Sequence, residues 1–82
     1  MRILIVDDEA SIRRTTAIAV QTTGHEAVEA SNGARALKLV ETEGFDVCFL
    51  DVKLGAEDGL VVMDKLLQVS PGLAVVMFTA FA

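Results

Sequence analysis

Short apolar runs alternate along the chain with segments of helical periodicity. The runs at residues 2–6, 47–50 and 73–78 are rich in β-branched and aliphatic side chains, which is typical of strands buried on both faces of a parallel sheet. Residues 25–30 alternate imperfectly between apolar and polar positions and are followed by Ser31-Asn32-Gly33, a turn sequence. This segment predicts a shorter, more exposed strand at an edge of the sheet.

The segments between these strands have apolar residues at helical spacing. We predict helices over residues 10–23, 34–42 and 59–69, with Asp58 as the N-cap of the third. Gly24, Gly44 and the sequence Ser70-Pro71-Gly72 follow the three helices as stop signals. The resulting order, β-α-β-α-β-α-β with short connections, predicts a single doubly wound parallel α/β domain.

Composition narrows the function classes. A length of 82 residues allows one modest core, and 52% hydrophobic residues are too many for a disordered chain. A net charge of −5 argues against direct binding to nucleic-acid phosphates, and the longest apolar run is too short to cross a bilayer. The single cysteine, Cys48, cannot form an internal disulfide, and no signal peptide is recognisable. We therefore expect a cytoplasmic protein, with Cys48 as a small, inert core residue.

Polar side chains follow three of the predicted strands. Asp7 and Asp8 come after the first strand, Asp51 after the third and Thr79 after the last. Ligands of such sheets bind beyond the carboxyl ends of the strands, so these residues are expected on one rim. Carboxylates gathered there would repel one another unless a cation lay among them, and Mg²⁺ prefers oxygen ligands. The pattern favours phosphoryl chemistry in which an aspartate attacks phosphorus and a hydroxyl binds a phosphoryl oxygen.

A purely structural interpretation is also available for each residue alone. Acids before a helix are common caps, so Asp7 or Asp8 by itself indicates a cap more often than a metal ligand, and Asp51 could cap a turn. The predicted convergence of two adjacent strand ends and a hydroxyl favours the site.

Three segments together carry a family resemblance. They are Ile-Leu-Ile-Val-Asp-Asp-Glu at 3–9, Asp-Val-Lys-Leu at 51–54 followed by Asp-Gly at 58–59, and Val-Val-Met-Phe-Thr-Ala-Phe-Ala at 75–82. The chain resembles the receiver domain of bacterial two-component response regulators, in particular that of the nitrogen-regulatory transcriptional activators. The resemblance implies a flavodoxin-like (CheY-like) parallel sheet, here with four strands in the order 2-1-3-4 and three helices. Residues 1–82 would form the N-terminal part of the domain, without its fourth helix, fifth strand and fifth helix.

The resemblance also implies roles for individual residues. Asp51 would accept a phosphoryl group from a sensor histidine kinase, and Thr79 would be the hydroxyl that binds the phosphoryl group when the domain switches. Mg²⁺ would be held by Asp8, Asp51 and the backbone carbonyl of Lys53, with Asp7 acting through water. The family's lysine at the end of the fifth strand has no counterpart in the sequence, which predicts crippled signalling.

The loop after Asp51 departs from the family pattern, and three charged or polar residues are expected on the surface of the domain. Gly55 stands where the family usually has a proline, which predicts a looser loop after Asp51. Arg13 and Arg14 are expected on a solvated face of the first helix, and His25 is expected to be solvated or capping.

The leading hypothesis is a switch that regulates an output domain, commonly a transcriptional activator, and is not an enzyme. The alternative is a structural fragment that keeps the acidic site but does not signal. Such a fragment would self-associate by pairing or exchange of its last strand, residues 73–78, because an apolar interior strand without a neighbour seeks one. Phosphatases that also form an aspartyl phosphate are disfavoured, because Lys53 occupies the position of their general acid.

Overall fold

The structure, a computed structural model, describes residues 1–78. Its helices and strands follow the predicted alternation, with one addition between the third long strand and the third helix. In chain order they are β1 (Arg2–Val6), α1 (Ala10–Thr22), β2 (Glu26–Ala30), α2 (Gly33–Thr42), β3 (Val47–Asp51), β4 (Lys53–Leu54), β5 (Glu57–Asp58), α3 (Gly59–Val69) and β6 (Ala74–Phe78).

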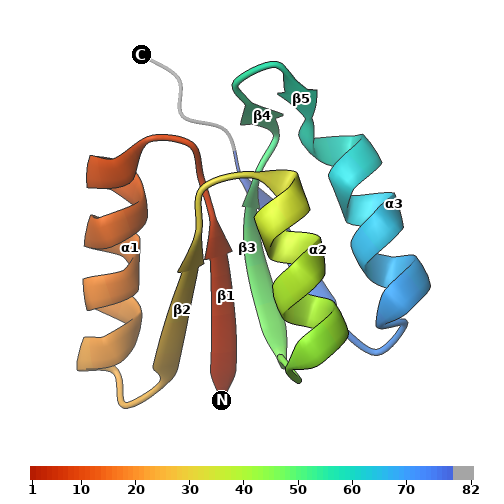
Figure 1. The fold of residues 1–82 in the computed structure, drawn as a ribbon. Coiled ribbons are helices and arrows are strands. Elements are labelled where there is room, and N and C mark those ends of the chain that lie inside the picture. Colours follow the sequence, from red (N-terminus) through yellow and green to blue (C-terminus); the bar gives the residue numbers. More distant parts are fainter. Residues whose placement is uncertain (79–82) are drawn as a thin grey trace.

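The four long strands form one parallel sheet in the order β2-β1-β3-β6 (Figure 1). Since β6 is the fourth long strand, this is the predicted order 2-1-3-4, and the edge position of β2 is confirmed. The central strands β1 and β3 are in register, with Val6 opposite Leu50, so that their carboxyl ends lie side by side. The residues that directly follow these two strands are therefore brought to one place.

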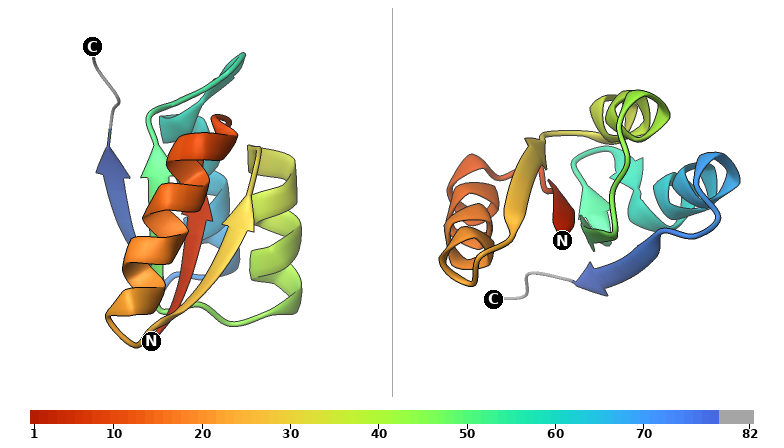
Figure 2. Two further views of the ribbon diagram at one scale, coloured as in Figure 1. Left: turned by 90° about the vertical axis from the view of Figure 1, so that its left-hand side faces the viewer. Right: turned by 90° about the horizontal axis from the view of Figure 1, so that it is seen from below.

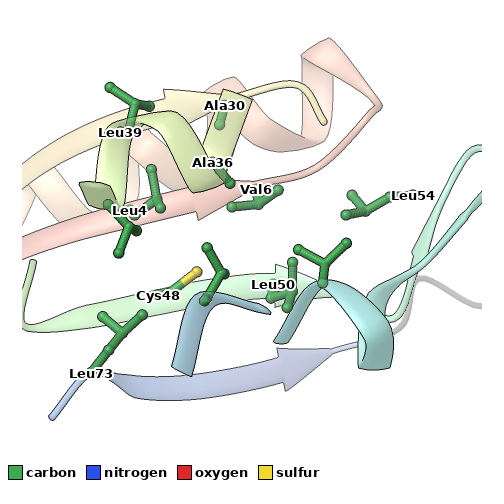
Figure 3. Packing of buried hydrophobic residues seen from close by; sticks show 12 residues of the cluster. Leu4, Val6, Ala30, Ala36, Leu39, Cys48, Leu50, Leu54 and Leu73 are labelled. Carbon is green, nitrogen blue, oxygen red and sulfur yellow. The ribbon is translucent and has the colours of Figure 1, made fainter. Parts of the chain in front are cut away.

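Helices cover both faces of the sheet (Figure 2). Side chains alternate between the faces along each strand. Ile3 and Ile5 of β1 pack with Ala17 of α1 on one face. The other face carries the larger core, in which strand side chains meet α2 and α3 (Figure 3); its buried members include Leu4, Val6, Ala36, Leu39, Cys48, Leu50, Leu54 and Leu66.

The core position of Cys48 is as predicted. Its side chain is fully buried, and burial raises the pKa of its thiol to about 12. A thiol with such a pKa stays protonated at neutral pH and is a poor nucleophile.

The last strand lies at the open edge of the sheet, as the predicted order 2-1-3-4 requires. Its apolar run is typical of burial on both faces, yet Val76 is 45% exposed. Val76 lies opposite Phe49 in the register and so faces the same side of the sheet as α1. Since α1 lies over β1 and β2, no helix in residues 1–78 covers this side of β6 (Figure 2).

Short polar and charged side chains shape the helix ends. Asp58 is the N-cap of α3 as predicted, and its carboxylate accepts a hydrogen bond from the Leu60 amide at 2.9 Å. Asn32 caps α2 in the same way, through the Arg35 amide at 2.8 Å.

Within the described chain, no helix has both the length and the hydropathy that crossing a bilayer requires.

Candidate functional site

Three carboxylates meet at the carboxyl edge of the sheet. Asp7 directly follows β1 and Asp51 is the last residue of β3, and these strands are neighbours. One oxygen each of Asp7, Asp8 and Asp51 can be chosen so that all three lie within 4.8 Å of one another. The structure thus brings together the three acids that the sequence placed on one rim.

The three acids differ in their surroundings. Asp7 is 1% exposed and Asp51 is 6% exposed, whereas Asp8 is open to solvent. Oδ1 of Asp7 accepts a hydrogen bond from the Glu9 amide at 2.9 Å, but its buried Oδ2 has no hydrogen-bond partner within residues 1–78. Buried polar atoms nearly always have a hydrogen-bond partner, so the unpartnered Oδ2 of Asp7 indicates that a ligand binds here.

The electrostatics of the three acids also favour a bound ligand, in this case a cation. Burial raises the pKa of Asp7, the Glu9 amide partly opposes that shift, and the nearby carboxylates Asp51 and Asp8 add to it. Both the loss of hydration and the repulsion between like charges disfavour three ionised carboxylates here. A bound cation would relieve both effects, because it replaces lost hydration and screens the repulsion.

The spacing of the donors fits a magnesium ion. Octahedral Mg²⁺ with bonds of about 2.1 Å holds its ligand oxygens roughly 3 Å apart when adjacent and roughly 4.2 Å apart when opposite. The three carboxylate oxygens lie within 4.8 Å of one another, so more than one of these carboxylates could contact the same ion or its bound water. The hard oxygen donors of this site suit Mg²⁺ and offer nothing to a soft metal.

A hairpin forms one wall of this site. A pocket above the acids is lined by Asp8, Glu9, Asp51, Lys53 and Gly55. The Lys53 amide donates a hydrogen bond to Oδ1 of Asp51 at 3.1 Å, which places this residue's backbone beside the central carboxylate. The role of the Lys53 backbone carbonyl as a metal ligand stays a prediction.

The hairpin itself was not predicted. Sequence reasoning took the residues after Asp51 as a polar loop, but β4 and β5 pair as an antiparallel ribbon. Gly55 is the first of its two loop residues and has φ +59°, which fits a turn that takes glycine there. Leu54 is 3% exposed and anchors the ribbon in the core. The prediction that the loop after Asp51 is looser than in the family stays a prediction.

Arg13 also has a role that sequence reasoning missed. It was expected on a solvated helix face, yet its side chain is 18% exposed and pairs with Glu29 at 3.1 Å. Its Nη1 donates a hydrogen bond to the backbone carbonyl of Asp7 at 2.9 Å. The prediction was wrong because β2 lies beside α1 and presents Glu29 to it. Arg14, which is 69% exposed, is solvated as predicted.

Thr79 lies outside the described residues, so its role at the site stays a prediction. His25 was expected to be solvated or capping. Nδ1 of His25, a residue that precedes β2, lies 3.2 Å from the amino group of Met1, at the end of the sheet opposite to the acids.

Fold and site together define a class of protein. A flavodoxin-like parallel sheet with three carboxylates at the ends of its central strands belongs to the doubly wound α/β domains, which bind ligands at this edge of the sheet. The chain belongs to a particular family within this class: residues 3–82 match the family model of the response regulator receiver domain, the receiver of two-component phosphorelays.

Individual relatives agree with the family. The chain is 39% identical over 79 residues to the alginate biosynthesis transcriptional regulatory protein AlgB of Pseudomonas putida, covering 96% of this chain and 18% of AlgB. Among solved structures, a CheY-like receiver domain protein of Methanospirillum hungatei JF-1 is 32% identical, with a TM-score of 0.92, and the match covers 99% of this chain and 65% of that one. The chain therefore spans less than two thirds of either relative.

A third relative was solved both with Mg(2+)-BeF and with a histidine kinase. The response regulator TrrA of Thermotoga maritima, in complex with Mg(2+)-BeF, is 32% identical with a TM-score of 0.90, and the match covers 99% of this chain and 70% of TrrA. TrrA was also solved in complex with the histidine kinase ThkA, with a TM-score of 0.89 at the same identity and coverage.

Proposed function

We propose that this chain acts as the phospho-acceptor part of a receiver switch, in which Asp51 takes a phosphoryl group from a phosphohistidine of a sensor kinase. The observation that carries the proposal is the convergence of Asp7, Asp8 and Asp51 within 4.8 Å at the ends of two adjacent strands. A kinase partner is supported by the relative TrrA, which was solved with a histidine kinase.

The side chain of Asp51 is arranged for nucleophilic attack. Its Oδ1 is held by the Lys53 amide, whereas its Oδ2 accepts no hydrogen bond from residues 1–78. A carboxylate oxygen would attack phosphorus as the phosphorus–nitrogen bond to the kinase imidazole breaks, and the leaving imidazole keeps the bonding electron pair. The product is an acyl phosphate on Asp51, and it persists as a signal until water hydrolyses it.

The neighbouring groups would hold Mg²⁺ and the phosphoryl group. Asp8, Asp51 and the Lys53 carbonyl would be direct ligands, Asp7 would act through water, and the Thr79 hydroxyl would bind a phosphoryl oxygen in the switched state. Bound Mg²⁺ would supply positive charge that offsets the negative charge of the phosphoryl oxygens. The unpartnered Oδ2 of Asp7 supports this assignment of a cation.

Phosphorylation by a small donor tests the proposal. The protein is incubated with Mg²⁺ and acetyl phosphate, and its intact mass is measured. We expect the mass of one added phosphoryl group in the unmodified chain and in Asp64→Asn, an exposed control on α3, but not in Asp51→Asn. An unmodified chain that gains no mass, or an equal gain in Asp51→Asn, would contradict the proposal.

We further propose that the receiver regulates an output domain in a longer cytoplasmic protein. AlgB is a transcriptional regulatory protein, and the chain corresponds to only 18% of it. In this arrangement the output domain would contact DNA, while the acidic receiver would bind neither nucleic acid nor membrane. Its activity would be that of a switch, with at most its own phosphorylation and dephosphorylation.

A second candidate function is self-association of the 82-residue chain through β6. The observation that favours it is the open edge of this strand, which pairs only with β3 in the described structure and exposes Val76. Light scattering over a concentration series tests it. We expect the average mass to rise with concentration, and less so in Val76→Lys, since charge on an edge strand opposes pairing. A monomer at every concentration rejects this candidate.

A further inference from the structure

Glu57 joins the hairpin beside the acids to a helix on the core side of the sheet. Its Oε1 accepts a hydrogen bond from the backbone amide of Gly33 at 2.8 Å. Glu57 is in β5, and Gly33 is the first residue of α2, 24 positions earlier in the chain. The contact therefore ties the segment that follows Asp51 to the start of α2.

Glu57 caps the start of α2 although it lies in another element, β5. The first amides of a helix have no partner within the helix. Asn32 satisfies the Arg35 amide of α2, and Glu57 satisfies the Gly33 amide. The negative charge of Glu57 also lies at the positive end of the α2 dipole, where it is stabilised.

The fit around this contact is close. A Cβ atom added at Gly33 would lie 2.7 Å from Oε2 of Glu57 and 2.7 Å from a methyl carbon of Val62, so a side chain here would displace one or both of them. Within the β4–β5 register, Glu57 lies opposite Leu54, next to Lys53. A constraint on Glu57 is thus passed across the two-stranded ribbon to the backbone of Lys53.

We infer that Glu57 is a positioning residue for the metal site. By holding β5 against the start of α2, it fixes the backbone of Lys53, whose amide donates to Asp51 and whose carbonyl is the proposed metal ligand. The inference rests on the proposed function, because it assumes that this carbonyl is a metal ligand. Glu57 touches neither metal nor substrate and acts only through the hairpin. Groups that orient metal ligands from behind commonly change metal affinity by about tenfold or more when they are removed.

The test measures Mg²⁺ affinity by calorimetry in four forms of the 82-residue chain. These are the unmodified chain, Glu57→Ala, Glu57→Gln, and Glu41→Ala as a control that removes the same charge from an exposed position near the other end of α2. We expect about tenfold weaker binding in Glu57→Ala. Glu57→Gln keeps an oxygen that can accept from the Gly33 amide, so its affinity should stay within about twofold of the unmodified chain.

A second readout separates positioning from general stability. Hydrogen exchange of the Gly33 amide, measured by NMR without Mg²⁺, should accelerate in Glu57→Ala and not in Glu57→Gln. Loss of the cap should lower the melting temperature of Glu57→Ala by only roughly 4–8 °C, so that this variant stays folded at 25 °C. Equal affinity in Glu57→Ala and the unmodified chain would overturn the inference alone. Equal weakening in Glu57→Gln and Glu57→Ala would also overturn it, since charge and not the hydrogen bond would then be responsible. An unmodified chain that binds no Mg²⁺ overturns the proposed function as well.

Discussion

Replacing Asp7 by asparagine should stabilise the metal-free protein. Asp7 is 1% exposed, its Oδ2 has no hydrogen-bond donor in the described structure, and two further carboxylates lie close by. In Asp7→Asn the charge is gone, Oδ1 can still accept from the Glu9 amide, and the new amide group can donate to a neighbouring carboxylate. A buried, unsatisfied polar group costs about 1–3 kcal/mol. Because asparagine remains a buried polar side chain, we expect a gain of about 1–2 kcal/mol in the free energy of unfolding.

The gain should depend on pH in a defined direction. The pKa of Asp7 is raised in the folded state above its ordinary value of 3.8, chiefly by burial. The fold therefore favours the protonated form, and this contribution to stability is complete below pH 3.8 and is lost as the pH rises through the folded-state pKa. The advantage of Asp7→Asn over the unmodified chain should thus be largest at neutral pH and shrink as the pH falls towards 4.

Urea and thermal unfolding in a chelator measure this effect. For a domain of this size, 1 kcal/mol corresponds to roughly 4–8 °C in melting temperature. Asp64→Asn, the same change at an exposed position on α3, should stay within about 0.5 kcal/mol of the unmodified chain. Adding Mg²⁺ should stabilise the unmodified chain more than Asp7→Asn, since a ligand stabilises the form that binds it. The reasoning is refuted if Asp7→Asn is no more stable than the unmodified chain at pH 7 without metal.

Three other predictions concern the core and the neighbours of the site. Leu66→Ala should cost about 2–5 kcal/mol in urea unfolding because Leu66 is fully buried, whereas Leu60→Ala at a half-exposed position should cost much less, and similar losses would contradict the packing described. Cys48, whose thiol pKa is raised to about 12 by burial, should react with a disulfide reagent at pH 8 only as fast as the protein unfolds, and rapid labelling of the folded protein would contradict its burial. Arg13→Ala should lower the unfolding free energy by about 1–3 kcal/mol, since the Asp7 carbonyl and Glu29 each lose a donor, and a change below about 0.5 kcal/mol would show that the contact is not formed in solution.

The arrangement of the sheet and its acids could be predicted from the sequence because both follow from periodicity. Apolar runs of four to six residues separated by helical segments permit few topologies, and the carboxyl ends of parallel strands share one edge. Asp7 and Asp51 then had to lie close together once β1 and β3 were neighbours. The family resemblance supplied the strand order and the roles, which periodicity alone does not contain.

The hairpin and its contacts could not be predicted in the same way. Strands of two residues, such as β4 and β5, are too short to produce a periodic pattern. The bond from Gly33 to Glu57 and the bond from Arg13 to the Asp7 carbonyl join residues whose proximity depends on the finished packing.

The stability of the central strand explains how the fold tolerates its acidic edge. Leu4, Ile5 and Val6, the three residues before Asp7, are fully buried, and burying such a side chain contributes about 1.5–3 kcal/mol. Their sum is several times the cost of about 1–3 kcal/mol for a buried, unsatisfied polar group. The strand β1 therefore keeps the Asp7 carboxylate buried although its charge is unfavourable there. A bound cation would reduce the repulsion between the carboxylates, and this gain would add to the free energy of cation binding.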